Sequence, residues 1–332
     1  MNGRDPLGVV FVLLAGVISW GFWGGFCHSS VAQSYPEKSV TLIAPFSAGG
    51  SVDMISRAVA LQMGLLWKQS VIVSNRPGAS GMIGVEAVVR SAPDGYSLLM
   101  ATTALSSSPS LFTKLSFDPI RDLAPISLVV TMSNVLVVHP FLPVNSVQQL
   151  LALAKRHPDQ LTSASAGMGS SNHLALVLFN RLGASHIGHV PYKGAAPALT
   201  DVMGGHVTMT FAPIAAIVSS VKSHRLKALA LTASSRSAVF PQLPTLAEAG
   251  LKGYESVGWN GLFAPQGLTK EMIGKINTTL RLSLNSAKVQ EVIIAGGADA
   301  VGSSVEGLEQ FLKQEVIKWR ELIQSAGIKG DE

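Results

Sequence analysis

Cysteine is almost absent from this chain of 332 residues, in which Cys27 is the only one. Cys27 lies in an N-terminal segment that we expect to be removed, so the mature protein would carry no thiol. Disulfide bonds, thiol catalysis and cysteine-ligated metal sites are then excluded. The fold must rest on its hydrophobic core alone, and 47% hydrophobic residues supply ample material for one.

Charged and aromatic residues are also scarce, at 14% and 6% of the chain. Lys and Arg number 25 against 20 acidic residues, and this small excess is spread along the sequence without a basic block. Nucleic-acid binding requires a basic stripe with aromatic residues between the charges. We therefore expect no nucleic-acid partner.

The sequence also has no complete catalytic or cofactor motif. Gly78–Gly81 falls one residue short of the G-x-S-x-G elbow, and Gly167–Gly169 lacks the third glycine of a dinucleotide fingerprint. His186 and His189 come closest to metal-ligand spacing but have no acidic partner beside them. We predict a protein that is not an enzyme and that holds neither a cofactor nor a metal.

A periplasmic hydrolase remains the alternative from another functional class. It would use Ser80 or Ser170 as the nucleophile together with a histidine. Such a pair requires the serine hydroxyl within hydrogen-bond reach of an imidazole.

The first 33 residues have the pattern of a secretory signal peptide. Arg4 precedes an uncharged run from Pro6 to Phe26, and Ser30–Ala32 forms a small-x-small cleavage site. We expect export, with cleavage after Ala32. The apolar run is longer than usual for a signal peptide, so an uncleaved membrane anchor is the alternative.

After residue 34 strands alternate with helices, which predicts α/β lobes whose sheets are mainly parallel and flanked by crossover helices. We predict a first lobe from residues 34–136, a second lobe from 137–250, and a return to the first lobe with C-terminal helices in 251–332. Strands are expected at Ala124–Val130 and Val135–Val138, whereas Trp259–Pro265 falls among turn signals. Two lobes of this kind would hold a ligand in the cleft between them.

Three turns rich in Gly or Ser lie between strands and helices, at Pro45–Ser51, Gly167–Ser171 and Tyr192–Ala195. Helix N-termini attract anions, and glycine lets the backbone approach a ligand closely. Lys193 is the only cation in these turns, which favours a small carboxylate held mainly by neutral donors over a phosphate held by arginines. The hydroxyl-rich segment Thr102–Pro109 follows a third strand, where open sheets place their ligands.

Six motifs spread over the chain after the signal resemble those of the Bug family, the extracytoplasmic solute receptors of tripartite tricarboxylate transporters. They are Tyr35-Pro36-Glu37-Lys38, Pro45-Phe46-Ser47-Ala48-Gly49-Gly50, Asn75-Arg76-Pro77-Gly78-Ala79, Pro93-Asp94-Gly95-Tyr96, His189-Val190-Pro191-Tyr192-Lys193-Gly194 and Pro244-Thr245-Leu246-Ala247-Glu248-Ala249-Gly250. The resemblance implies a two-lobe periplasmic binding protein of type II, located in the periplasm.

The same resemblance implies a partner and a ligand. The ligand would be a small carboxylate, such as a di- or tricarboxylate, an acidic amino acid or an aromatic acid, often bound through water. The receptor would act as a monomer and deliver this ligand to the membrane permease of a tripartite tricarboxylate transporter. A receptor without a permease, which presents its closed form to a membrane sensor kinase, is a further alternative.

The resemblance also implies a set of ligand-binding residues, carried over position by position. These are Phe46, Ser47, Ala48, Gly49, Gly50, Asp53, Thr102 and Thr103 in the first lobe, and Ala166, Gly167, Ser170, His173, Tyr192, Lys193 and Asp201 in the second. The chain departs from the family pattern at Ser47, Ser51, Val52 and Ser108. Asp53 would repel a carboxylate unless the ligand carries an amine or Asp53 only caps its helix.

Overall fold

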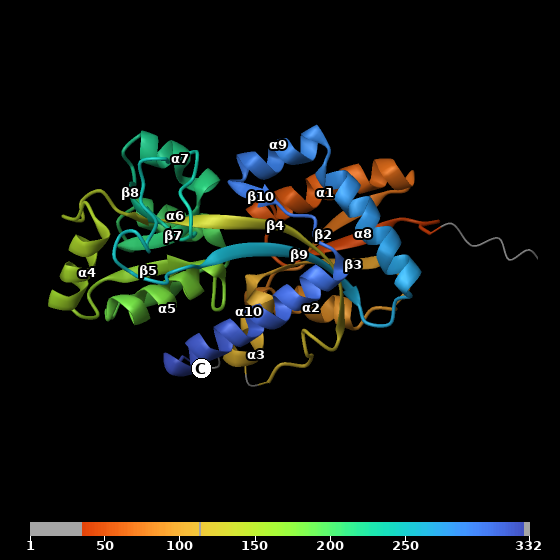
Figure 1. Ribbon diagram of the computed structural model, residues 1–332, viewed down its shortest axis with the longest axis horizontal. Coiled ribbons are helices and arrows are strands. Elements are labelled where there is room, and N and C mark those ends of the chain that lie inside the picture. The colour runs from red at the N-terminus through yellow and green to blue at the C-terminus, as the bar shows by residue number, and fades with distance from the viewer. Residues whose placement is uncertain (1–34, 113, 329–332) are drawn as a thin grey trace, which may run out of the picture. The chain divides into compact units, whose positions relative to one another are not determined.

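The computed structural model describes residues 35–112 and 114–328 (Figure 1). The predicted signal peptide, with Cys27 and the cleavage site after Ala32, lies outside the described residues. Among the helices of the described part, none is both long and apolar enough to cross a membrane.

Strands and helices alternate along the chain as predicted. The strands are β1 (Val40–Ala44), β2 (Val71–Asn75), β3 (Ser97–Thr102), β4 (Leu123–Val138), β5 (Thr162–Ser165), β6 (Gly188–Pro191), β7 (Met209–Pro213), β8 (Lys227–Leu231), β9 (Val257–Pro265) and β10 (Ala298–Ala300). The helices are α1 (Ser51–Trp67), the short 3₁₀ turn η1 (Ala79–Gly81), α2 (Met82–Val89), α3 (Thr103–Leu111), α4 (Val147–Arg156), α5 (Ser171–Gly183), α6 (Ala195–Met203), α7 (Ile214–Lys222), α8 (Lys270–Leu284), α9 (Ala287–Ala295) and α10 (Val305–Ser325).

The strands form two sheets, which agrees with the prediction of two α/β lobes. Both sheets contain β4. The first has the order β2-β1-β3-β9-β4, with β10 also paired to β4, and the second has the order β4-β7-β5-β6, with β8 also paired to β4. Among the strands, β1 pairs parallel with β2 and β3, and β5 pairs parallel with β6 and β7. Both sheets are mixed and not mainly parallel as predicted, because β4 and β9 pair antiparallel with their neighbours.

β4 is one continuous strand, and the prediction of two separate strands at Ala124–Val130 and Val135–Val138 is wrong. It pairs with β9 up to Ser133 and with β7 from Asn134, so it carries the chain from the first sheet to the second. The assignment of Trp259–Pro265 to turns is also wrong, because these residues lie in β9. Figure 1 shows β9 beside β4, and its other edge pairs with β3.

The hydroxyl-rich segment after β3 is helical and forms α3. The Thr102 hydroxyl caps this helix by accepting a hydrogen bond from the amide of Ala104 at 3.4 Å. Pro109 lies inside the helix and has no N–H for the carbonyl of Leu105, but the Ser108 hydroxyl donates to that carbonyl at 2.9 Å. Ser108 is fully buried there.

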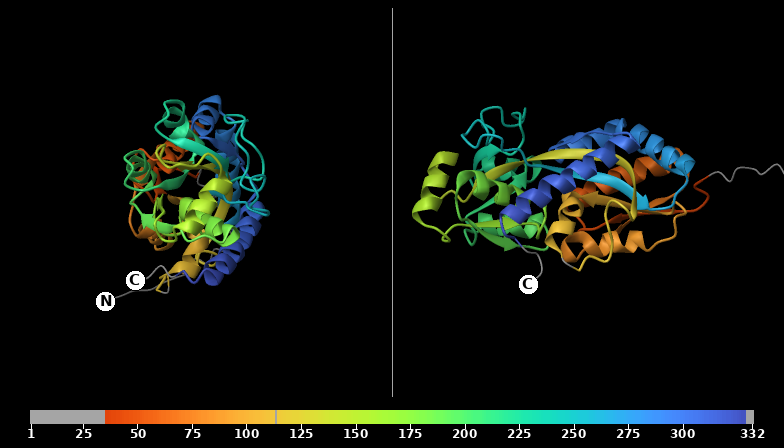
Figure 2. Two further views of the ribbon diagram at one scale, coloured as in Figure 1. Left: turned by 90° about the vertical axis from the view of Figure 1, so that its left-hand side faces the viewer. Right: turned by 60° about the horizontal axis from the view of Figure 1, so that its bottom comes forward.

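Hydrophobic clusters cover both faces of each sheet. On β9, Leu262 and Ala264 face the cluster beneath α1 and α8, whereas Trp259 and Phe263 face the cluster beneath α2 and α10. A smaller cluster joins Leu111 of α3, Leu174 and Val177 of α5, and the C-terminal part of α10. Figure 2 shows α10 extending from the elements of the first sheet to those of the second.

Candidate ligand-binding site

A cavity of about 230 Å³ lies where the N-termini of four helices meet. These helices are α1 and α3, which flank the first sheet, and α5 and α6, which flank the second. Apolar walls are supplied by Phe46, Met132, Pro213 and Trp259. The first-turn N–H groups of a helix have no partner inside the helix, so four such ends form an environment that favours an anion.

Two of the four helices begin at a glycine that provides no capping side chain. These are Gly50 before α1 and Gly194 before α6, and the residues that follow each of them also line the cavity. Among residues 35–112 and 114–328, Lys193 is the only charged side chain in the lining, so no carboxylate of this part of the chain lines the cavity. The helix ends and Lys193 give the cavity a positive potential.

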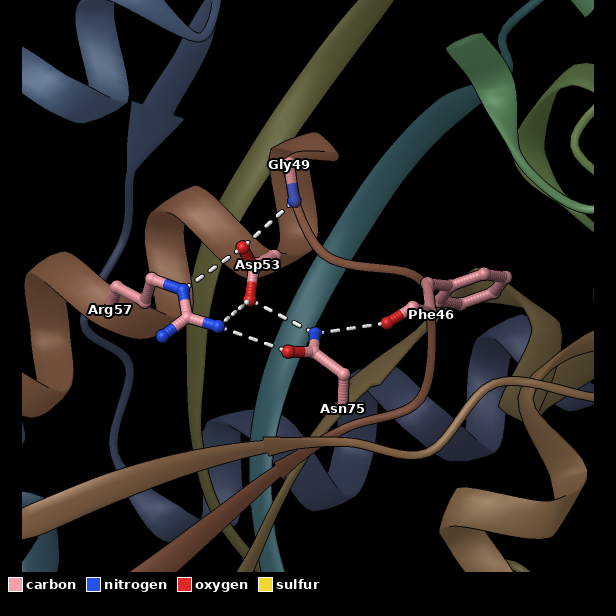
Figure 3. Close-up of polar contacts among 5 residues, drawn as sticks. All are labelled: Phe46, Gly49, Asp53, Arg57 and Asn75. Carbon is pink, nitrogen blue, oxygen red and sulfur yellow. Dashed lines mark hydrogen bonds and ion pairs between the residues drawn. The ribbon is translucent and has the colours of Figure 1, made fainter. Parts of the chain in front are cut away.

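Asp53 is the centre of a hydrogen-bond network that holds the loop before α1 (Figure 3). Its Oδ2 atom accepts from the Gly49 amide at 2.9 Å and from Nε of Arg57 at 3.0 Å. Its Oδ1 atom accepts from Nδ2 of Asn75 at 2.9 Å, and this Nδ2 also donates to the Phe46 carbonyl at 3.0 Å. The network therefore fixes both ends of the segment from Phe46 to Gly49.

Asp53 is only 4% exposed, and the charge of its carboxylate is balanced by Arg57. Burial raises the pKa of its carboxyl, but the hydrogen bonds from Arg57, Gly49 and Asn75 and the charge of Arg57 outweigh burial and hold the pKa below 3.8. Asp53 does not line the cavity. Its pairing with Arg57 removes the expected repulsion of a carboxylate.

On the other side of the cavity, the loop before α5 is held by buried side chains. The Ser170 hydroxyl caps α5 by accepting from the His173 amide and donates to the Gly167 carbonyl at 2.6 Å. The Gly169 amide donates to Nδ1 of His173 at 3.1 Å, and the His173 ring stacks on His189 with centroids 4.1 Å apart. These bonds fix the backbone that presents Ser170 to the cavity.

Both histidines are held neutral by their surroundings. Burial, together with the neighbouring His189, lowers the pKa of His173 to about 3, and burial lowers the pKa of His189 to about 4. The unfolded chain therefore binds more protons than the folded chain below pH ~6.5, and stability falls as the pH drops from that value toward 4.

We expect His173→Asn to reduce this pH dependence. Asparagine offers an oxygen near the place of Nδ1, so the Gly169 amide keeps an acceptor while the titrating group is lost. Between pH 7.5 and pH 5 the wild type should lose about 2 kcal/mol more free energy of unfolding than the variant. Urea unfolding at the two pH values measures this difference, and parallel losses in both proteins would contradict it.

A hydrogen bond joins α3 to the loop before α5, on the opposite side of the cavity. The Ser107 hydroxyl of α3 donates to the Gly169 carbonyl at 3.0 Å. Gly169 has φ +71°, and a Cβ at this position would lie 2.5 Å from the Ser107 hydroxyl. A glycine is thus required both by the backbone angle and by this close approach.

The structure brings most of the predicted ligand-binding residues to the cavity. Those that line it are Phe46, Ser47, Ala48, Gly49, Gly50, Thr102, Thr103, Ala166, Ser170 and Lys193. Gly167, His173, Tyr192 and Asp201 lie outside the lining, as Asp53 does. Their contact with a ligand remains a prediction, and so does that of the lining residues.

Tyr192 and Asp201 are paired with each other. The Tyr192 hydroxyl donates to Oδ2 of Asp201 at 2.6 Å, and this bond, with burial, raises the pKa of Tyr192 to about 12. The pair ties the turn before α6 to a later turn of the same helix. The hydrogen bond therefore positions the loop that carries Lys193.

Several lining residues were not predicted from the sequence. Met132 and Asn260 come from the middle of β4 and β9, and Pro213 ends β7. Asn172 follows the predicted Ser170 by two residues and donates to the Phe211 carbonyl. No motif singles out Met132, Asn260 or Pro213, because they reach the cavity through strand pairing between distant segments. Asn172 reaches it because it lies in the first turn of α5.

The geometry required of the alternative hydrolase is absent for both of its serines. Neither Ser80 nor Ser170 makes a hydrogen bond to an imidazole within the described residues. The Ser165 hydroxyl does lie 2.6 Å from Nε2 of His189, but Ser165 is 1% exposed and outside the cavity lining. Its hydroxyl also donates to the Gly167 carbonyl and accepts from the Gly167 amide. In residues 35–112 and 114–328 no group of three or more His, Cys, Asp or Glu could hold a metal.

Comparison with known proteins gives one family. Residues 55–328 match the model of the tripartite tricarboxylate transporter family receptor, TctC. Protein BugT of Bordetella pertussis is 34% identical over 99% of both chains. The structure of R. palustris Rpa4515 with adipate superposes with a TM-score of 0.84 at 32% identity, covering 89% of this chain and 99% of that one.

A second solved structure has the same fold. MatC from Rhodopseudomonas palustris with bound malate superposes with a TM-score of 0.82 at 29% identity, covering 87% of this chain and all of that one. The matched proteins are substrate-binding receptors, not enzymes. The chain therefore belongs to the tripartite tricarboxylate transporter receptor family, the Bug family of solute-binding proteins.

Proposed function

We propose that this protein is a periplasmic receptor that captures a small carboxylate in the cavity and delivers it to the permease of a tripartite tricarboxylate transporter. The receptor acts as a monomer of two lobes, formed by residues 34–136 with 251–332 and by residues 137–250, which close on the ligand. The candidate ligands are di- and tricarboxylates, acidic amino acids and aromatic acids.

The meeting of four helix N-termini in one cavity supports this proposal most strongly. Within the part of the chain that the structure describes, the lining has a lysine and hydroxyl groups but no acidic side chain. Hydrogen bonds to a charged group contribute about 1.5–3 kcal/mol each, and micromolar binding needs about 8 kcal/mol. A few amides and hydroxyls are enough to reach it. Relatives solved with adipate and malate support the same ligand class.

A thermal-shift screen tests the proposal directly. The purified protein is unfolded and refolded to remove any ligand that copurifies, and it is then screened with di- and tricarboxylates, acidic amino acids and aromatic acids. A ligand at a hundred times its Kd should add about 2.7 kcal/mol of stability, which raises the Tm by about 5–10 °C. If no carboxylate raises the Tm, the proposed function is wrong.

Lys193→Met is expected to weaken carboxylate binding about three- to tenfold. The lysine is exposed at the rim of the cavity, so water and salt screen its charge and limit its contribution. Calorimetry at low and high salt should show that the salt dependence of wild-type affinity is reduced in the variant. Lys155→Met on α4, whose lysine is equally exposed but outside the lining, is the control and should bind as the wild type does.

A receptor that serves a sensor kinase instead of a permease is the second candidate. Purification of membrane partners with and without ligand separates the two. Recovery of permease subunits supports transport, and recovery of a kinase in the presence of ligand supports sensing.

A further inference from the structure

Asn260 lies in the middle of β9 and in the wall of the cavity, where it is 1% exposed. Strand pairing places it beside Thr102 of β3 on one edge and Val130 of β4 on the other. Its Oδ1 atom is buried and has no hydrogen-bond partner among the described residues. Native proteins nearly always provide a buried acceptor with a donor, so this oxygen requires an explanation.

Core packing does not explain an asparagine at this position. Side chains alternate along a strand, so Asn260 shares its face of β9 with Leu262 and Ala264. Both of these are in the buried cluster beneath α1 and α8, and Val130 belongs to the same cluster. Leucine has a similar size and would continue this apolar face without leaving a polar atom unpaired. The asparagine occurs where this face of the sheet reaches the cavity.

Other buried side chains in the described part of the chain also have unpaired oxygen or nitrogen atoms, but they lie elsewhere. They are Ser56, Ser110, Asn134, Ser163 and Ser256. None of these five lines the cavity, whereas Asn260 does. Asn260 therefore combines an unpaired buried acceptor with a place in the wall of the cavity.

The chemistry of an amide oxygen limits what can satisfy it. Oδ1 only accepts hydrogen bonds, and so do the oxygens of an ionised carboxylate. A carboxylate therefore fits the helix N-termini but leaves Oδ1 unpaired. An O–H or N–H group elsewhere on the same ligand can pair with it.

From this we propose that Asn260 is a specificity-determining residue, whose Oδ1 accepts a hydrogen bond from a hydroxyl or ammonium group on the carbon skeleton of the ligand. The inference rests on the proposed carboxylate-binding function and narrows it to hydroxy and amino acids. Unsubstituted acids of the same length bind more weakly, because they leave Oδ1 unpaired and gain no hydrogen bond from it.

Matched acids test this inference by calorimetry. The probes are succinate, malate and aspartate, which differ only at one carbon, and glutarate, 2-hydroxyglutarate, glutamate and 2-oxoglutarate as a longer series. The wild type should bind the hydroxy or amino member of at least one series about 10- to 100-fold more tightly than the unsubstituted acid.

Asn260→Leu should remove this preference. The variant is expected to bind the hydroxy or amino acid about 10- to 100-fold more weakly than the wild type, and the unsubstituted acid at least as tightly. Asn260→Ala, which cannot overfill the site, should lose the preference as well. Thermal melting without ligand checks that both variants fold, and the leucine variant should be at least as stable as the wild type.

Ser163→Ala is the matched control, because it also removes an unpaired buried oxygen but lies outside the cavity. It should keep the wild-type preference. The inference is overturned if the wild type binds both members of each pair equally, if it prefers 2-oxoglutarate to 2-hydroxyglutarate, or if the Asn260 variants keep the preference. Each of these results leaves the receptor function intact. Failure to bind any of the seven acids also overturns the inference, whereas the receptor function is overturned only if no carboxylate of the wider thermal-shift screen raises the Tm.

Discussion

Replacing Asp53 with alanine is expected to weaken carboxylate binding about 100-fold and to lower the free energy of unfolding by about 3 kcal/mol. The carboxylate accepts hydrogen bonds from the Gly49 amide, from Arg57 and from Asn75. Bonds to a charged acceptor contribute about 1.5–3 kcal/mol each. Because Arg57 is half exposed, water replaces part of what is lost, and a net change of about 3 kcal/mol is expected. Ordering each freed loop residue again on binding costs about 1–2 kcal/mol, and two such residues account for the change in affinity.

Calorimetry and urea unfolding measure the two effects of Asp53→Ala. Glu309→Ala is the control, because Glu309 and Lys313 form another ion pair at i,i+4 spacing in a helix, with both side chains about half exposed. That pair should contribute less than about 0.5 kcal/mol, and its loss should leave binding unchanged. If Asp53→Ala and Glu309→Ala behave alike, the carboxylate does not organise the loop.

Acid should remove the Asp53 contribution from the wild type. The pKa of Asp53 is lowered in the folded protein, so its stabilisation is present above the ordinary value of 3.8 and is lost as the pH falls through the folded value. Asp53→Asn keeps one acceptor but does not titrate. The wild type should therefore lose its stability advantage over this variant below pH ~4.

The sequence predicted the parts of the fold that depend on local pattern. The strand and helix that surround the loop at Pro45–Ser51 follow from an apolar run, a glycine-rich turn and helical spacing, and the structure confirms them. Local pattern did not predict β9, because its residues Gly258, Asn260 and Gly261 have low strand propensity. β9 is a strand because β3 and β4 pair with both of its edges, and such non-local pairing leaves no local signal.

The same distinction separates the predicted part of the site from the rest. The glycine-rich and hydroxyl-bearing residues at helix N-termini follow from local sequence, and most of them line the cavity. Asn75 lies in one of the six motifs, but no sequence pattern connects Asn75 or Arg57 with the loop that they hold. Their role depends on β2 lying parallel to β1, which brings Asn75 to the level of Ala44, just before the loop that it holds. Spacing along the chain could not reveal that contact.

Replacing Glu315 with alanine is expected to lower the free energy of unfolding by about 4 kcal/mol and the Tm by about 10 °C. Glu315 of α10 is 7% exposed, and its Oε2 atom accepts from the indole nitrogens of Trp259 at 3.1 Å and Trp319 at 2.7 Å. Both indoles are at most 1% exposed. Removal of the carboxylate leaves two buried N–H donors unpaired, and each costs about 1–3 kcal/mol.

Glutamine at position 315 separates the loss of the acceptor from the loss of volume. Its amide oxygen can still accept from the indoles, so Glu315→Gln should lose only about 1–2 kcal/mol. Glu321→Ala, which removes an exposed carboxylate from the same helix, should change stability by less than about 0.5 kcal/mol. Because Trp259 also lines the cavity, Glu315→Ala should shift tryptophan fluorescence to longer wavelength and weaken carboxylate binding. A loss below 1 kcal/mol in Glu315→Ala would mean that the indoles find other acceptors and that the carboxylate does not hold this wall of the cavity.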